Sequence, residues 1–402
     1  MAETLAQWLV AQGLKGAPIA DIMDGFCQRL GDDGFPLALG TVELRVPHPQ
    51  YGAIRFCWRR ELGAEAERLD HGELDLFEGP LAPPSRSETD MAVLRRRLED
   101  PACPRDLPGL SRLAAAGITD HLRVVVPTDE TSPPYGLVTS WATDRAGGFA
   151  DDEIERLMRL LPLVAIAIKA SAAPRAARSL LTIYLGHDAG ARVLAGKVRR
   201  GATTSIRAVL CYADLAGFTS FADRAESAVV IAALDLYFEA LVIPIERCGG
   251  QILKFMGDGL LAIFALSDFD DDAEQAVAAA LDAAEDAVRG VEALNARRRD
   301  AGEVAMEVDL ALHLGEVHYG NVGTDERMDF TVIGPAVNEA SRFEALCGQL
   351  DRRILASAAF AGAAGRERHR LEPLGRHRLR GVREAQELFG IARHRSDEGG
   401  DV

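Results

Sequence analysis

The sequence contains very little lysine and no excess of positive charge. Only four of its 45 basic residues are lysine, and 61 acidic residues bring the formal net charge to −16. This balance argues against a general nucleic-acid or anionic-membrane surface, because both need basic patches. It does not argue against a nucleotide, whose charge a metal ion and a few arginines neutralise locally. We therefore expect no nucleic-acid partner.

Cysteine motifs and long apolar runs are also absent. The six cysteines are scattered, with no Cys-x-x-Cys motif, so we expect reduced and buried thiols in a reducing cytoplasm. The longest apolar run, residues 160–168, is too short to cross a bilayer and is flanked by Arg159 and Lys169. No signal peptide opens the chain. We expect a soluble, cytoplasmic protein without a membrane span.

The remaining composition is that of an ordinary globular protein. Hydrophobic residues make up 48% of the chain and charged residues 26%. A length of 402 residues favours two or three domains rather than one.

One short stretch, residues 251–264, combines a turn signal with two unusual charges. Two apolar runs flank Gly257-Asp258-Gly259, and this pattern predicts a β-hairpin packed on a core. Lys254 lies inside the first apolar run, in a chain that otherwise uses arginine for positive charge. The simplest interpretation of Asp258 is a good turn former. The alternative is a metal ligand.

A second carboxylate in a similar setting favours the metal ligand. Residues 207–213 form another apolar strand, which ends at Asp214. If the two strands are neighbours in one sheet, Asp214 and Asp258 meet at one end of it. Two carboxylates with little else nearby repel each other unless a cation lies between them. Oxygen ligands of this kind suit Mg²⁺ or Mn²⁺ in a two-metal phosphoryl-transfer centre.

Three segments together resemble the class III nucleotidyl cyclase catalytic domain. They are YADLAGFT at residues 212–219, KFMGD at residues 254–258 and TVIGPAVNEASR at residues 331–342. The resemblance covers residues 206–393, in the family's order and with similar gaps. It implies an α+β fold over residues 206–395 with a ferredoxin-like, palm-type sheet. The apolar pattern agrees, because it predicts the order β-α-β-β-α-β.

The resemblance also implies the metal and phosphate contacts. Asp214, Asp258 and the Leu215 carbonyl would hold two Mg²⁺ or Mn²⁺ ions, and the loop at Phe218 would approach the phosphates. Asn338 and Arg342, four residues apart on one helix face, would orient the ribose and stabilise charge at the α-phosphate. Taken singly, each is equally typical of a solvated helix surface. Triphosphate contacts would come from Arg380, where the family usually has lysine, and from Arg327.

Two further positions would read the base. Lys254 matches the lysine that distinguishes adenylate from guanylate cyclases, because an ammonium only donates hydrogen bonds and meets adenine N1. Thr331 matches the second base-reading position, as in a bacterial Lys/Thr subclass. It is also an ordinary β-branched strand residue.

The implied activity is the conversion of ATP to 3′,5′-cyclic AMP and pyrophosphate at the interface of a homodimer. One protomer would bring Asp214 and Asp258, and the other would bring Lys254, Thr331, Asn338, Arg342 and Arg380. Two alternatives remain. A guanylate cyclase is disfavoured by Lys254, and a catalytically silent ligand-binding dimer module is disfavoured because both carboxylates, the asparagine and the arginine are present.

The N-terminal part, residues 1–170, resembles a GAF- or PAS-type sensory domain. Mixed strands are followed by a long helix, and the ending over residues 141–170 is most similar to the GAF pattern. An unidentified small molecule would be its ligand. Trp58, Trp141 and His71 are candidates for lining a pocket, or they are plain core and surface residues.

Residues 171–205 are predicted to be a helical linker. Pro174 is expected to break the preceding helix, and two short helical patterns follow around Gly186. We favour a linker that transmits a signal over a passive tether.

Overall fold

The computed structural model describes residues 3–73, 91–104, 109–127, 137–380 and 384–392. The chain divides into two compact units, Met1–Leu180 and Leu181–Val402. Each is described here by itself.

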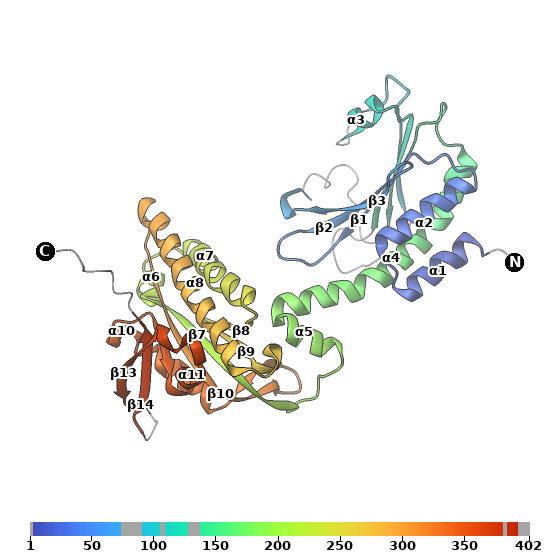
Figure 1. The fold of residues 1–402 in the computed structure, drawn as a ribbon. Helices are drawn as coiled ribbons and strands as arrows, with labels where there is room; N and C mark the ends of the chain where they lie inside the picture. The colour runs from blue at the N-terminus through green and yellow to red at the C-terminus, as the bar shows by residue number, and fades with distance from the viewer. Residues whose placement is uncertain (1–2, 74–90, 105–108, 128–136, 381–383, 393–402) are drawn as a thin grey trace. The chain divides into compact units, whose positions relative to one another are not determined.

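The N-terminal unit is a six-stranded antiparallel sheet with helices on one face (Figure 1). The strand order is β3-β2-β1-β6-β5-β4. In chain order the elements are α1 (Leu5–Lys15), α2 (Ile19–Asp32), β1 (Leu39–Arg45), β2 (Ala53–Arg59), β3 (Gly63–Leu69), β4 (Ala92–Arg97), α3 (Leu110–Ala115), β5 (Asp120–Val126), β6 (Leu137–Thr143) and α4 (Asp151–Leu185). The sequence pattern predicts a helix break at residues 16–18 and strands over residues 37–46, 54–58, 122–127 and 135–142, and the helices α1 and α2 with the strands β1, β2, β5 and β6 confirm these predictions. The Pro- and Ser-rich residues 79–88, for which the sequence predicts an irregular region, lie outside the described residues.

The two tryptophans singled out in the sequence belong to this unit's core. Trp141 is fully buried, contacts Phe26 edge-on with ring centroids 5.6 Å apart, and donates its indole N–H to Thr139. The indole N–H of Trp58 donates to Asp24 over 3.0 Å. His71 is exposed and contacts the His48 carbonyl. Of the two interpretations left open, plain core and surface is therefore the correct one.

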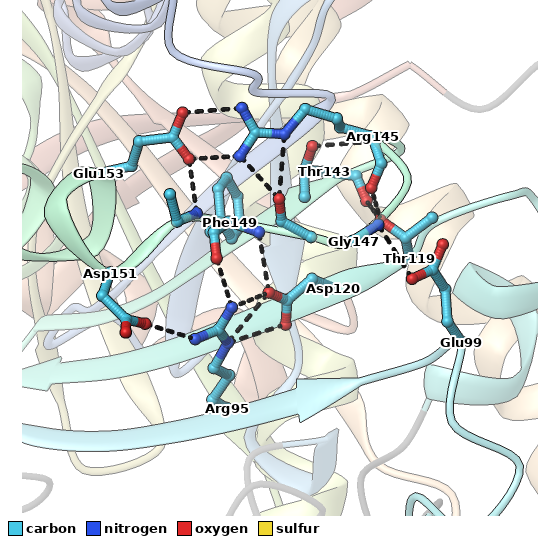
Figure 2. Close-up of polar contacts among 12 residues, drawn as sticks. Arg95, Glu99, Thr119, Asp120, Thr143, Arg145, Gly147, Phe149, Asp151 and Glu153 are labelled. Atoms are coloured by element: carbon cyan, nitrogen blue, oxygen red, sulfur yellow. Dashed lines mark hydrogen bonds and ion pairs between the residues drawn. The ribbon is translucent and has the colours of Figure 1, made fainter.

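A network of charged groups anchors the start of α4 to the sheet (Figure 2). The fully buried Asp120 carboxylate accepts from Arg95 Nη2 over 2.7 Å and from the Phe149 backbone N–H over 3.0 Å. Gly148 makes this possible, because a Cβ there would lie 2.5 Å from Asp120 Oδ2 and the residue has φ +75°. Glu153 accepts from Arg145 and from the Ala150 N–H. The helix α4 starts with the acidic residues Asp151, Asp152 and Glu153, as the sequence pattern predicts.

The helix α4 continues through both of its prolines, so the predicted break at Pro174 is wrong. Proline removes one backbone hydrogen bond and usually kinks or ends a helix. Here apolar packing holds both sides: Ala167 and Ile168 are buried before Pro174, and Leu185 packs on a cluster of the next unit after it. The first of the two helical patterns predicted around Gly186 is the end of α4. The second is α5 (His187–Leu194).

The C-terminal unit is an eight-stranded sheet with helices on both faces. The predicted order β-α-β-β-α-β is confirmed by β7 (Thr203–Ala216), α7 (Ser227–Arg247), β8 (Gln251–Met256), β9 (Gly259–Ala265), α8 (Ala273–Asp300) and β10 (Glu307–Gly323). The remaining elements include α6 (Phe218–Ala222), β11 (Met328–Ile333), α9 (Pro335–Glu344), α10 (Cys347–Leu350), β12 (Ile354–Ser357), α11 (Ala358–Ala363), β13 (Leu371–His377) and β14 (Gln386–Ile391).

The sheet order explains how distant segments meet. It runs β13-β14-β12-β10-β7-β9-β8, with β11 paired to β10. The helices α7, α8 and α11 pack on one face, and α5, α9 and α10 on the other. The sequence pattern predicts one helix over residues 337–347, whereas the structure divides this stretch between α9 and α10. The sequence pattern does not predict β13. β13 contains Pro373 and a register shift, which weaken its strand pattern.

Two helices, α4 and α7, are long and apolar enough to cross a bilayer by length and composition alone. The buried share of the most apolar window is 39% in α4 and 28% in α7. Helices of a soluble core pass the same test, and both contribute buried side chains to the clusters described above. The absence of a membrane span therefore stays a prediction.

Candidate active site

The carboxylates of Asp214 and Asp258 lie at the same end of the sheet. β7 and β9 are antiparallel neighbours with Ala213 opposite Leu260, so the end of β7 lies beside the Gly257-Asp258 turn. Gly259 leaves the space between them, because a Cβ there would lie 2.8 Å from Asp214 Oδ1. Burial and, next, the negative charge of Asp258 raise the pKa of Asp214 to about 6. The two acids therefore repel each other in the fold.

Two acids that the sequence analysis missed extend this cluster. Asp309 on β10 lies opposite Asp214, and its carboxylate pairs with Arg353 over 2.7 Å. Glu344, the last residue of α9, has its pKa raised to about 7 by burial and by the charges of Asp214, Asp309 and Asp258. A signal existed for Asp309, which is an acid inside an apolar strand. Glu344 had none, because its approach depends on how α9 packs.

The acidic cluster contains few positively charged side chains. Among the described residues, Arg353 is the one cation paired with Asp309, and neither Asp214 nor Asp258 forms an ion pair. Two acids held together without a counter-ion fit a divalent cation. The described residues contain no group of three or more His, Cys, Asp or Glu side chains that could hold a metal ion by themselves. This does not contradict the fit, because Mg²⁺ is bound through one or two carboxylates together with substrate phosphates.

The proposed base-reading residues lie on strands that approach each other. Lys254 is half-buried on β8, and its Nζ lies 3.9 Å from Asp329 Oδ2 on β11. Two residues further along β11, Thr331 is only 5% exposed, and its hydroxyl has no hydrogen-bond partner among the described residues. A buried hydroxyl without a partner is uncommon and costs free energy. The hydroxyl of Thr331 is therefore left unsatisfied by the described chain.

The remaining predicted residues are spread over the unit. Leu215 points into the core, so only its backbone carbonyl is available to a metal ion. Phe218 begins the short helix α6 and packs toward Phe221. Arg327 lies in the exposed β10–β11 turn, and Arg380 is exposed after β13. No contact in the described structure brings either arginine to the carboxylates of the same chain.

Asn338 and Arg342 lie on α9, which packs against β7 and β10. Asn338 is exposed and Arg342 is half-buried. Among the described residues, neither side chain has a recorded hydrogen bond or ion pair, so both are available for a ligand.

The helix α5 lies directly beneath the base-reading strands. Its residue Ala189 shares one buried cluster with Leu253 of β8 and with Phe330 and Val332 of β11. Asp188 of α5 accepts from the Tyr319 hydroxyl over 2.8 Å and pairs with Arg192 over 2.6 Å. The chain that enters this unit is therefore packed against the strands that carry Lys254 and Thr331.

Comparison with known proteins identifies this unit. Residues 203–392 match the family model for the adenylate and guanylate cyclase catalytic domain. Over these residues the chain is similar to the adenylate and guanylate cyclase catalytic domain that the sequence resemblance implied.

Known proteins are similar to parts of this chain. An adenylate cyclase of Anabaena cylindrica is 32% identical over 155 residues, covering 39% of this chain and 30% of its own length. An uncharacterized protein of Mycobacterium tuberculosis is 30% identical over 188 residues, covering 46% of this chain and 33% of its own. The chain thus spans about a third of the length of these relatives. The adenylyl cyclase CyaB from P. aeruginosa aligns over 49% of this chain and 100% of that structure, with 24% identity and a TM-score of 0.43.

Proposed function

We propose that the protein is an adenylate cyclase that converts ATP to 3′,5′-cyclic AMP and pyrophosphate. One observation carries the proposal: Asp214 and Asp258 are held together without a cation partner in the described chain, beside strands that carry Lys254 and Thr331. Paired acids of this kind belong to metal-dependent phosphoryl transfer. The alternative of a silent binding module has no use for two mutually repelling carboxylates.

The metal ions would be Mg²⁺ or Mn²⁺, held by the carboxylates of Asp214 and Asp258 and by the Leu215 carbonyl. When bound, such ions lower the pKa of the attacking hydroxyl and neutralise charge on the phosphates. The chain's own part is to hold the two carboxylates in place beside each other. Gly259 contributes by leaving the space that the Asp214 carboxylate occupies.

The preference for ATP rests on Lys254 and Thr331. The ammonium of Lys254 donates to adenine N1, whereas guanine presents an N–H donor at that position. Asp329 Oδ2 lies 3.9 Å from the ammonium. The unpartnered Thr331 hydroxyl then takes the second hydrogen bond to the base.

The catalytic site would be completed by a second copy of the chain. The acidic cluster has one paired guanidinium in its own described chain, yet a triphosphate brings further negative charge. Asn338, Arg342, Arg380 and Arg327 of one copy would therefore serve the carboxylates of the other. A homodimer with shared sites explains why these arginines are free of ion pairs among the described residues.

We further propose that residues 1–170 act as a sensor. The helix α4 begins in the core of the first unit, and its last residues belong to the second. The helix α5, which follows directly, packs beneath β8 and β11. A rotation or shift of α4 is thereby converted into a displacement of the base-reading strands.

Product analysis tests the activity. The full-length protein is incubated with ATP or GTP and Mg²⁺ or Mn²⁺, and the products are separated by chromatography. We expect cyclic AMP from ATP and little product from GTP. Efficient conversion of GTP would identify a guanylate cyclase instead, and no product from either nucleotide would favour the silent module.

A mixing experiment tests the shared site. Asp214→Ala and Arg342→Ala should each be inactive, because each spoils both sites of its own homodimer. Mixed together, the two variants form heterodimers with one intact site, and activity should return. Continued inactivity of a mixture that demonstrably exchanges subunits would contradict sharing.

A further inference from the structure

The N-terminal unit contains a pocket of about 380 Å³ that no part of the proposed reaction uses. It lies between the start of α2, the β1–β2 hairpin and the second half of α4. This volume is within the ~300–1,000 Å³ of small-molecule sites. Most of the wall is aliphatic, including Ile19, Leu44, Val46, Ile54, Ala172 and Ala176.

The charged side chain in the pocket wall is positive. Among the described residues, no aspartate or glutamate lines the pocket, although acids outnumber bases in the whole chain by 61 to 45. Arg175 of α4 is the charged residue of the wall, and its guanidinium donates to the backbone carbonyls of Gly16, Ala17 and Ser171. Carbonyls carry no full negative charge, so the cation keeps the capacity to pair with an anion.

A second cationic side chain, Arg68, adds positive charge near the β1–β2 hairpin. The guanidinium of Arg68 lies 5.2 Å from the ring of Tyr51, which is part of the wall and stacks on His48 with centroids 3.8 Å apart. Burial and the charge of Arg68 lower the pKa of His48. The ring is therefore mostly neutral at pH 7, and the hairpin presents apolar rings beside a guanidinium.

We propose that this pocket binds an aliphatic carboxylate, such as a medium-chain fatty acid, with its chain among the aliphatic residues and its head group at Arg175. Burying the chain removes its methylene groups from water, which favours binding. The carboxylate gains a charge-assisted hydrogen bond that a neutral or cationic head group lacks. Because Ala172, Arg175, Ala176 and Ser179 all lie on α4, the ligand contacts the helix that leads into the catalytic unit.

Calorimetric titration of the full-length protein tests the binding separately from any cyclase activity. Decanoate is the probe, with 1-decanol and decylammonium as matched ligands of different head-group charge. We expect saturable binding of decanoate, weaker binding of decanol and none of decylammonium. Equal binding of decanol and decanoate, or binding of decylammonium, would overturn the assigned chemistry.

Variants locate the site. Ala176→Trp fills the pocket and should abolish decanoate binding, whereas Ala177→Trp, on the exposed adjacent position, should leave it unchanged. Ala176→Leu is a milder replacement, and it should weaken binding if the tryptophan variant does not fold. Arg175→Gln keeps hydrogen-bond donors but loses the charge, and should weaken binding about tenfold. Unchanged affinity in Ala176→Trp or Arg175→Gln would overturn the proposal. A second copy of the chain that fills the pocket would also overturn the proposal. In that case the wild type would not bind decanoate, and Ala176→Trp would change the oligomeric state.

Discussion

Asp120 in the N-terminal unit and Asp214 in the C-terminal unit are both carboxylates at the end of a buried strand, but their neighbours differ. Asp120 is fully buried and receives hydrogen bonds from Arg95 and the Phe149 N–H. Asp214 is half-buried beside a second acid, Asp258, and the described chain offers it no cation. A compensated carboxylate holds a fold together, whereas an uncompensated one is kept for a ligand.

Glycine does not distinguish the two. Gly148 gives room to the carboxylate of Asp120, and Gly259 gives room to that of Asp214, since a Cβ at either position would lie within 3 Å of a carboxylate oxygen. The difference lies in the partner cation. Structural and chemical roles can therefore be separated by substitutions at matched positions.

The largest effect on stability is expected for Asp120→Ala. The substitution leaves the Arg95 guanidinium without its buried partner, which costs about 3–5 kcal/mol. Urea unfolding followed by circular dichroism measures the loss. The control is Asp151→Ala, because Asp151 also pairs with Arg95 but is 96% exposed, and should cost no more than about 1 kcal/mol. Equal losses would show that burial of Asp120 is unimportant.

The reverse pattern is expected for Asp214→Asn. Loss of one charge at the proposed metal site should lower kcat by ~10²–10³-fold, with the free energy of unfolding changed by less than about 1 kcal/mol. Steady-state assays of cyclic AMP formation and urea unfolding are compared on the same preparations. Asp223→Asn, at an exposed acid of the same unit, should leave both unchanged. An active Asp214→Asn protein would remove this residue from the reaction.

The glycine at the buried carboxylate gives a smaller effect. Gly148→Ala introduces a Cβ 2.5 Å from Asp120 Oδ2 at φ +75°. Backbone strain and the clash together should cost ~2–4 kcal/mol. Gly147→Ala has a similar φ of +84° but open space around the new Cβ, so it should cost ~1 kcal/mol. The difference in stability between the two variants, measured from their melting curves, gives the cost of the contact between the new Cβ and Asp120. Identical curves would mean that the Asp120 side chain moves away at little cost.

The smallest effect is a pH dependence. The pKa of Asp214 is raised from 3.8 to about 6, so the folded state favours the protonated form. Its contribution to stability is therefore complete below pH 4 and is lost as the pH rises through about 6. For a half-buried group the loss is on the order of 1 kcal/mol. Without divalent cations, Asp214→Asn should flatten this part of the stability–pH curve, and an unchanged curve would contradict the raised pKa.

The sequence predicted the hairpin and the meeting of its turn with the end of β7, because both depend on local turn chemistry and on apolar runs. It did not reveal Glu344, whose position depends on the packing of α9 against the sheet, nor the Asp309–Arg353 pair across two strands. The continuity of α4 through Pro174 was missed for a related reason: the buried side chains before the proline and the packing of Leu185 at the end of the helix outweigh a local breaking signal.

Manganese binding followed by electron paramagnetic resonance tests the central claim most directly. Full-length protein is titrated with Mn²⁺ in the presence of an ATP analogue that cannot cyclise. We predict that the wild type binds Mn²⁺ well beyond the nucleotide alone and that Asp214→Asn and Asp258→Asn lose this binding, while Asp120→Asn keeps it in the folded fraction. Equal Mn²⁺ binding by the wild type and both active-site variants would contradict the account.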